Sequence, residues 1–380
     1  MTDADTTLPP DAHDRERTRT DLTSTLFVEA GAGAGKTSSL VDRVVNLVES
    51  GVDITAIAAI TFTEKAAAEL RVRLRDAFSQ RTDETARRAL DDLDHAPIGT
   101  LHAFARRILN DFPIDDGLPP GFGVLDELDS NLRFDDEWSD LLDQLLRDPD
   151  PATPLDGGRT LVELCNFENF GVDKDLKKVA LDFRYNWDLI EPLVDLSDPG
   201  PFVIATGAVV AAARDIAQTP VPSGDTQEQL VTKIGLAADE LADAVQLSAQ
   251  LDQLLALSKA VGKPMRKGSK ANWKTLGEDR LHDLRAREQQ LVDDIEAVLQ
   301  RVRAYRKRLA GAIAGRFVLD SVRGRIEAGV LDFHDLRVHA RRLVATGDNV
   351  EIRRALHERY ARVLLDEFQD TDPIQLEIAV

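Results

Sequence analysis

The chain has 380 residues, of which 43% are hydrophobic and 30% charged, the composition of a folded globular protein long enough for two or three domains. Its net charge of -20 argues against general electrostatic attraction to nucleic acid, so any contact with DNA must come from local basic patches. The single Cys165 excludes an internal disulfide and a multi-cysteine zinc or iron–sulfur site. The sequence shows no signal peptide and no run of membrane-spanning length, so we expect a cytoplasmic protein without a membrane partner.

Residues 1–20 predict a polar tail and a charged helix that leads into the first strand. From Leu26 the chain continues as LFVEAGAGAGKTSSL, an apolar run that breaks into small residues and resumes as a helix. The run from Leu26 to Ala30 has the length and composition of a short buried strand. The segment from Lys36 has helical spacing, with Leu40 and Val44 on one face.

Three glycines separate this strand from this helix. Gly31, Gly33 and Gly35 permit turns that a Cβ would forbid, so successive N–H groups can converge on one anion. The helix start adds unpaired N–H groups and the positive end of the helix dipole. The pattern predicts a phosphate cradle in which Lys36 reaches the β- and γ-phosphates and the Thr37 hydroxyl binds Mg²⁺. The predicted cradle residues are Ala30, Gly31, Ala32, Gly33, Ala34, Gly35, Lys36, Thr37 and Ser38.

A second apolar run, residues 57–62, predicts another buried strand, and it leads into the sequence TFTEKAAAEL. The order of strand and helix places Thr61 and Thr63 at the carboxyl edge of a sheet, where open α/β sheets bind ligands. An ordinary helix with Thr63 as its N-cap would explain the same residues.

A further motif, DEFQDT, follows a predicted buried strand at residues 363–365. This strand is expected to bring Asp366 and Glu367 to the sheet edge next to the glycine cradle. An aspartate there can hold Mg²⁺ together with Thr37, and a glutamate can orient and deprotonate the attacking water.

In this order, AGAGAGKT, TFTEKAAAEL and DEFQDT resemble the motifs of UvrD/RecB-type DNA helicases of superfamily 1A, and the large segment between them favours the RecB/AddA branch. The resemblance implies a RecA-like P-loop NTPase fold, with a parallel sheet that is incomplete in these 380 residues. It implies ATP and Mg²⁺ as cofactors, and ATP hydrolysis that drives 3′-to-5′ movement on single-stranded or partly duplex DNA in repair or recombination. The implied protein partner is a second subunit of a helicase–nuclease complex.

The resemblance also implies roles for single residues. Lys36, Asp366, Glu367 and Gln369 are the implied catalytic residues, with Gln369 sensing the γ-phosphate region, and Thr37 and Asp366 are the implied Mg²⁺ ligands. The segment IGTLHAF at residues 98–104 is similar to the family's T-x-H-x-F element. The implied DNA-binding residues are Thr61, Phe62, Thr63, Lys65, Thr100 and His102.

Two positions depart from the family pattern. Ala30 replaces the first glycine of G-x-x-x-x-G-K-[ST], a form that superfamily 1 helicases often have. The glutamine with which the family reads adenine is missing near Asp11. His13 is either its substitute or an exposed polar residue of the helix.

The residues from about 131 to 328 predict helices cut by loops, and we interpret them as an inserted subdomain similar to the family's 1B. The expected division is a tail and lead-in helix at 1–20, the first part of the ATP-binding domain at 21–130, the insertion at 131–328 and the return to the ATP-binding domain at 329–380. The sequence LDFHDL at 331–336 is expected to mark this return structurally. Asp126 is expected to pack and cap a helix.

A basic patch inside the insertion surrounds Trp273. Two interpretations are open: the patch binds DNA phosphates with a base or sugar stacked on the tryptophan, or it is a solvated loop. Its cations are Lys263, Arg266, Lys267, Lys270 and Lys274.

Two other functions fit the sequence. One is a P-loop ATPase without helicase action, whose activity would be indifferent to single-stranded DNA. The other is a non-catalytic remnant that binds DNA or a partner through the helical insertion. We also expect these 380 residues alone to turn ATP over poorly, because the resemblance assigns transition-state arginines to a second RecA-like domain.

Overall fold

A computed structural model describes residues 11–31, 33–112, 117–147, 158–166, 171–193, 202–263, 267–345, 349–367 and 373–379. The chain divides into two compact units, Met1–Ser130 with Gly324–Val380, and Asn131–Arg323. The first unit contains the strands of both small parallel sheets, and the second is built of helices in its described residues. An α/β fold with a parallel sheet was predicted, and the described residues form a mixed α/β chain that is mostly helical and has a small parallel sheet.

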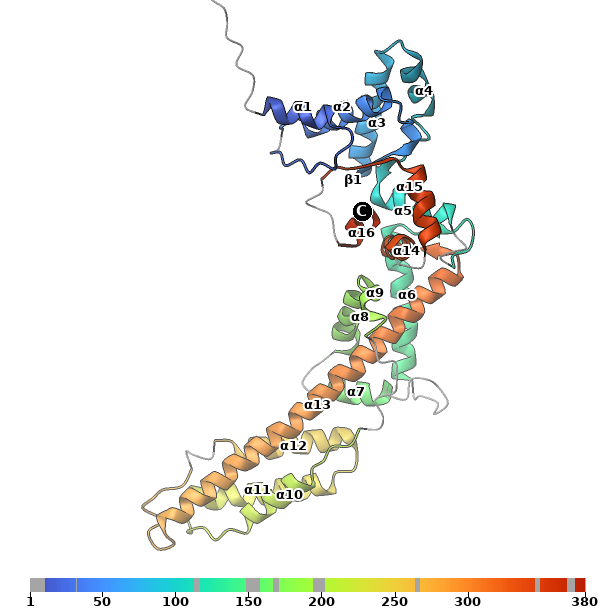
Figure 1. The fold of residues 1–380 in the computed structure, drawn as a ribbon. Helices are drawn as coiled ribbons and strands as arrows, with labels where there is room; N and C mark the ends of the chain where they lie inside the picture. The colour runs from blue at the N-terminus through green and yellow to red at the C-terminus, as the bar shows by residue number, and fades with distance from the viewer. Residues whose placement is uncertain are drawn as a thin grey trace, which may run out of the picture. The chain divides into compact units, whose positions relative to one another are not determined.

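The main sheet has three parallel strands in the order β2-β1-β5, of which Figure 1 labels the central strand, β1. The central strand β1 (Ile57–Thr61) is buried at every position and pairs with β2 (Ile98–Thr100) and β5 (Arg362–Leu365). Its alternating side chains enter two different cores, because successive residues of a strand point to opposite faces. Ile57 and Ala59 join one core, whereas Ala58 and Ile60 join the other.

Helices cover both faces of this sheet. The core that contains Ile57 also receives side chains from α2 (Lys36–Glu49), α3 (Glu64–Ser79) and α4 (Glu84–Asp92). The opposite core takes residues of α5 (Leu101–Asp111), α14 (Phe333–Ala345), α15 (Val350–Arg359) and α16 (Pro373–Ala379). Although they are far apart in sequence, α5 and α14 lie side by side (Figure 1). The lead-in helix α1 (Ala12–Thr20) packs against α2.

Two strand predictions need correction. Leu26–Ala30 is not a strand: Phe27 is 75% exposed, and the segment pairs with no strand of the described residues. An apolar run becomes a strand only where a neighbour accepts its backbone hydrogen bonds. The other predicted strand forms as β5, but it is only partly buried, because among the described residues β1 is its single neighbour in the sheet.

A second, two-stranded ladder joins β3 (Gly123–Val124) to β4 (Val330–Leu331) in the first unit. Asp126 follows β3 and accepts a hydrogen bond from the Asp129 N–H at 2.8 Å, which confirms its predicted capping of α6 (Glu127–Leu146). After β4, Asp332 accepts hydrogen bonds from the N–H groups of His334 and Asp335 at the start of α14, both at 2.9 Å. The LDFHDL segment is thus a structural element, as predicted.

Beside these turns lies a buried ionic group. Arg325, near the end of α13 (Glu278–Glu327), donates two hydrogen bonds to the Asp335 carboxylate, at 2.8 and 2.9 Å. Asp332 Oδ2 is 3.6 Å from the same guanidinium and accepts a hydrogen bond from the Ser130 hydroxyl at 3.4 Å. Arg325 is 4% exposed and Asp335 is fully buried, so this pair is part of the core.

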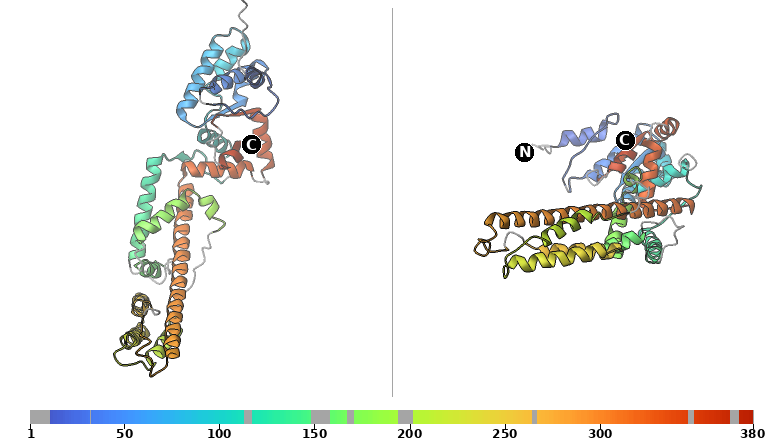
Figure 2. Two further views of the ribbon diagram at one scale, coloured as in Figure 1. Left: turned by 90° about the vertical axis from the view of Figure 1, so that its left-hand side faces the viewer. Right: turned by 90° about the horizontal axis from the view of Figure 1, so that it is seen from below.

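The elements of the second unit are all helices in the part of the chain that the structure describes. Its elements include α7 (Gly158–Asn166), η3 (Val172–Leu176), α8 (Lys177–Arg184), α9 (Trp187–Ile190), α10 (Gly207–Ala217), α11 (Thr226–Asp243), α12 (Leu247–Val261) and most of α13. Helices α10, α11 and α12 lie beside the N-terminal half of α13 and share one core with it (Figures 1 and 2). Burial raises the pKa of Cys165 to about 11, which keeps this thiol protonated. In the part of the chain that the structure describes, no helix is long and apolar enough to cross a membrane.

Candidate functional site

The predicted cradle forms a glycine turn that ends at the first residue of α2. Gly33 has φ +75° and Gly35 has φ +86°, a left-handed conformation that L side chains rarely adopt. Gly35 is the N-cap of α2 and offers no side-chain capping bond. The helical bond Ser39 N–H to Gly35 O, 3.0 Å, closes the first turn, so the amides before it have no partner within the helix. This combination of a left-handed turn and an uncapped helix start suits a bound phosphate.

The structure brings the two ends of the chain together at this turn. Lys36 Nζ, in the first residue of α2, lies 3.7 Å from Glu367 Oε2, which follows β5. The two side chains are 31% and 41% exposed, so the pair is open to solvent and gains little from its mutual attraction. A lysine held this loosely can exchange its carboxylate partner for a phosphate.

Asp366 and Glu367 take their positions from the sheet. The Asp366 N–H extends the β1–β5 ladder by donating to Ile60 O at 2.9 Å, and Asp366 Oδ1 then accepts the Glu367 N–H at 3.0 Å. Glu367 has φ +57°, the one non-glycine residue with positive φ among those described. Such a conformation costs about 1 kcal/mol or more and clusters at functional sites.

The predicted magnesium ligands are Thr37 and Asp366, both partly buried. Described His, Cys, Asp and Glu side chains nowhere form a group of three that could hold a metal ion. Magnesium differs from zinc in that one or two protein ligands suffice, with waters and nucleotide phosphates supplying the rest. A hydroxyl and a carboxylate therefore fit this metal.

The predicted DNA-binding residues follow β1 and β2 at the same edge of the sheet. Register places Thr61 opposite Thr100, one residue beyond the Ile60–Leu365 pair that precedes Asp366. The three positions therefore form a row across the carboxyl ends of the strands, at the sheet edge where the sequence places them.

The threonine hydroxyls of this row already have intramolecular partners. Thr63 Oγ1 accepts the Ala66 N–H at 3.1 Å and caps α3, while Thr61 Oγ1 donates to Thr63 O at 3.1 Å. Thr100 Oγ1 donates to Glu64 Oε1 at 2.8 Å and accepts the Ala103 N–H at 3.3 Å. The capped-helix alternative is thus present in the structure, and it fixes both helix starts at the edge.

Two aromatic rings and a lysine are accessible near these turns. Phe62 is 58% exposed between Thr61 and Thr63, and Lys65 is exposed on the first turn of α3. The His102 ring is partly buried and lies 5.0 Å from the ring of Phe333, at an angle of 57°. This surface offers a cation and aromatic faces, the groups that bind single-stranded nucleic acid.

Arg15 was missed by the sequence analysis. A Cβ placed on Gly35 would lie 3.4 Å from Arg15 Nη1, so this guanidinium from α1 lies directly against the glycine turn. Asp11 holds it there through a 2.7 Å hydrogen bond. The charged composition of residues 11–20 gave no signal, because it fits any exposed helix.

Other predicted residues lie apart or outside the description. Ala32 and Gln369 fall outside the described residues, as does Arg266 of the basic patch. Trp273 is fully buried in the core of the second unit, so it is not available to stack on a base. Lys270 pairs with Glu278 at 3.4 Å. The stacking interpretation of the basic patch is therefore wrong.

Comparison with known proteins decides the family. A family model described as UvrD/REP helicase N-terminal domain matches residues 11–380. The chain belongs to this family. The similar proteins are of the AddA type, the branch that the large segment between the motifs favoured, and each is named as a subunit of an ATP-dependent helicase/nuclease.

Three of these relatives show the extent of the similarity. The protein of Pediococcus pentosaceus is 25% identical over 403 residues, which cover 92% of this chain and 31% of the relative. That of Clostridium perfringens is 26% identical over 408 residues with the same shares. That of Levilactobacillus brevis is 38% identical over 135 residues, 33% of this chain and 11% of the relative. The present chain thus spans about a third of the length of the first two of these curated relatives.

Proposed function

We propose that this chain forms the ATP-binding part of a DNA helicase, with a RecA-like core in which Lys36 and Glu367 serve one nucleotide. The observation that carries the proposal is the 3.7 Å approach of these two side chains at the carboxyl edge of a parallel sheet. About 330 residues of sequence separate them, and both belong to motifs of the UvrD/REP family. Open α/β sheets bind ligands at this edge.

In the proposed site, the turn at residues 30–38 holds the nucleotide phosphates and Lys36 neutralises the β- and γ-phosphates. Arg15, next to Gly35, adds a second cation from α1. Thr37 and Asp366 hold Mg²⁺, and Glu367 orients and deprotonates the attacking water. Gln369 senses the γ-phosphate. When bound, Mg²⁺ supplies charge to the transferring phosphoryl group, and the chain's own contribution is positioning.

Single-stranded or partly duplex DNA binds across the neighbouring turns in this proposal. Lys65 contributes charge, while Phe62 and His102 offer ring faces for bases. The threonines Thr61, Thr63 and Thr100 position the two helix starts and present backbone amides to phosphates. ATP hydrolysis then moves the protein in the 3′-to-5′ direction, in cytoplasmic DNA repair or recombination.

The names of the relatives suggest an assembly. Because each is designated as one subunit of a helicase/nuclease, we propose that the whole protein acts with a second subunit. We further propose that these 380 residues alone bind nucleotide weakly and hydrolyse it slowly, since the proposed site needs arginines from a second RecA-like domain to stabilise the transition state.

Binding of a fluorescent ATP analogue in Mg²⁺ tests the nucleotide site. Lys36→Ala should weaken binding by more than tenfold, because a charge-assisted contact of about 2 kcal/mol is lost. Arg87→Ala, which removes an exposed arginine from α4, is the matched control and should leave affinity unchanged. Equal affinities of the Lys36→Ala variant and the unchanged chain would refute the site.

A second candidate is a P-loop ATPase without helicase action. It is favoured by one observation: the hydroxyls of Thr61, Thr63 and Thr100 are all engaged within the protein. ATP turnover measured with and without single-stranded DNA distinguishes the two. DNA should stimulate a helicase and leave the other ATPase unaffected.

A further inference from the structure

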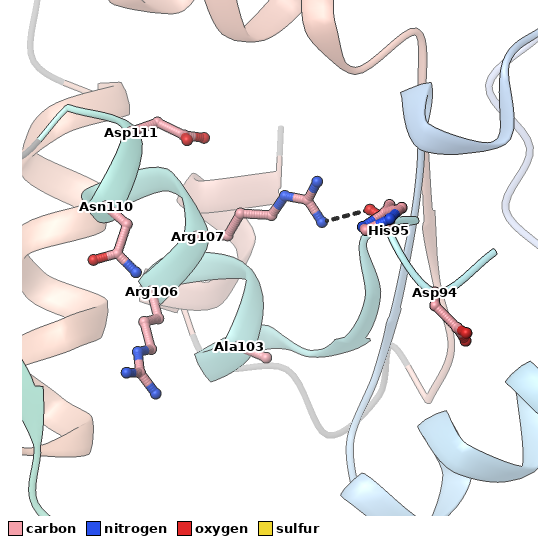
Figure 3. A pocket seen from close by; sticks show the side chains of 7 residues that line it. All are labelled: Asp94, His95, Ala103, Arg106, Arg107, Asn110 and Asp111. Carbon is pink, nitrogen blue, oxygen red and sulfur yellow. Dashed lines mark hydrogen bonds between the residues drawn. The ribbon is translucent and has the colours of Figure 1, made fainter. Parts of the chain in front are cut away.

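A pocket of about 400 Å³ opens on the first unit, and none of the residues assigned a role above lines it. It is lined by one face of α5 and by the turn that precedes β2, and Figure 3 shows the side chains around it. The lining residues are Asp94, His95, Ala103, Arg106, Arg107, Asn110 and Asp111. Only Ala103 belongs to a sequence motif, the IGTLHAF segment, and most of the lining residues are polar or charged.

The charges of this pocket favour an anion. Its two carboxylates are already neutralised from outside, because Asp94 pairs with Arg75 at 2.6 Å and Asp111 with Arg359 at 2.5 Å. Arg106 and Arg107 also line the pocket. The lining residues and their ion-pair partners thus include four guanidinium groups and two carboxylates. A positive excess of this size suits a phosphate ester more than a neutral ligand.

The two pocket arginines differ in how they are held. Arg107 is fixed, since its Nη1 donates to His95 O at 3.0 Å, the bond drawn in Figure 3. Arg106 is exposed and has no hydrogen-bond or ion-pair partner within the described residues. One guanidinium is therefore available to an incoming group, next to the Asn110 amide one turn further along.

The position of the pocket relates it to the proposed DNA surface. His102, Arg106 and Asn110 follow one another at four-residue spacing, which places them in a row on one face of α5. The row covers about 12 Å at 1.5 Å per residue. A polyanion in contact with His102 thus reaches Arg106 by following the helix axis.

We propose that this pocket binds the sugar–phosphate backbone of the DNA strand after it leaves His102, with Arg106 and Asn110 contacting phosphate oxygens. The inference rests on the proposed function, and it adds a contact that carries no base specificity. Phosphate contacts of this kind position a strand and contribute affinity that falls as salt concentration rises.

Fluorescence anisotropy of a labelled oligothymidylate of about 16 nucleotides tests the proposal on the 380-residue chain. Arg106→Ala should weaken binding about fivefold at 0.1 M salt and reduce the slope of log K against log salt by about 0.7, the loss of one phosphate contact. Arg87→Ala on α4 is the control for a general loss of charge. Affinity for the ATP analogue and the melting temperature should not change, because Arg106 is exposed and belongs to none of the segments of the proposed nucleotide site.

The outcomes separate this inference from the function on which it rests. If Lys65→Ala weakens DNA binding and Arg106→Ala behaves like Arg87→Ala, the pocket does not bind the strand, but the DNA surface stands. If neither Lys65→Ala nor Arg106→Ala has an effect, both fail. If Arg106→Ala weakens binding of labelled polyglutamate as much as that of DNA, the pocket accepts acidic chains in general and the proposed phosphate contact is overturned.

Discussion

Two ion pairs of the first unit have similar chemistry and opposite surroundings. Lys36 and Glu367 approach to 3.7 Å with both side chains open to solvent. Arg325 and Asp335 form two hydrogen bonds, of 2.8 and 2.9 Å, inside the core. The exposed pair can separate and accept a ligand, whereas the buried pair cannot open without leaving a charge in an apolar environment. The degree of burial therefore distinguishes an ion pair that can bind a ligand from one that stabilises the core.

The sharpest test of this difference is removal of one buried partner. Asp335→Ala removes the two hydrogen bonds by which this buried carboxylate pairs with Arg325 and should lower the free energy of unfolding by about 3–5 kcal/mol. Urea denaturation measures the change. The double variant Arg325→Met with Asp335→Leu should recover only part of the loss, because it removes the unpaired guanidinium but leaves the buried Asp332 carboxylate without its cation. A loss below about 1 kcal/mol for Asp335→Ala would show that the buried pair contributes no more to stability than an exposed ion pair does.

The second unit offers a third case for this comparison, a buried carboxylate whose hydrogen-bond donor is a glutamine. Glu288 is fully buried and accepts a hydrogen bond from Gln227 Nε2 at 3.2 Å. Burial raises its pKa to about 7, and the Gln227 hydrogen bond with the nearby Arg285 and Arg287 opposes this only in part. Because the folded pKa exceeds the ordinary value of 4.5, its contribution to stability is complete below about pH 4.5 and is lost as pH rises through 7.

Glu288→Gln should therefore raise stability in alkaline solution, by up to about 3 kcal/mol at pH 9 relative to the unchanged chain. Near pH 4.5 the two proteins should melt alike. Melting temperatures recorded across this range check the prediction, and parallel curves for the two proteins would show that Glu288 does not titrate in it.

The exposed pair of Lys36 and Glu367 should contribute little to stability and much to nucleotide binding. Lys36→Ala is expected to change the free energy of unfolding by less than about 1 kcal/mol, as for other exposed ion pairs, although it should weaken nucleotide binding by more than tenfold. Urea denaturation of the variant without nucleotide is the measurement. A destabilisation as large as that of Asp335→Ala would mean that Lys36 is a structural residue.

The smallest effect is expected in the segment before the glycine turn. Val28 is 49% exposed, so Val28→Ser should alter stability by no more than about 0.5 kcal/mol. If residues 26–30 were a buried strand, the same substitution would cost about 1–3 kcal/mol. Thermal melting decides between these values.

These comparisons show what the sequence could and could not predict. The turn at residues 30–38, the edge threonines and the acidic pair were found because their backbone and charge requirements are local and leave a motif. The prediction of a strand at residues 26–30 was wrong, since strand formation depends on a pairing partner that the hydrophobicity of the segment does not reveal. Trp273 was assigned to a surface because its neighbours in sequence are basic, yet its indole is in the core.

Contacts between distant segments gave no sequence signal. Arg15 looked like any cation of an exposed helix, and only the packing of α1 on α2 brings it to Gly35. Arg325 was hidden in a 50-residue helix rich in arginine, and its buried role depends on the turn before α14. The pocket along α5 needs the turn before β2 as its second wall.

The central claim is that Lys36 and Glu367 act on one magnesium-bound nucleotide, and a double-mutant cycle tests it most directly. Affinity for the fluorescent ATP analogue in Mg²⁺ is measured for Lys36→Ala, Glu367→Gln, the double variant and the unchanged chain. Side chains in contact should give a coupling energy of at least about 0.5 kcal/mol. Effects that add within about 0.3 kcal/mol would show that the two ends of the chain act at separate places, contrary to the proposed site.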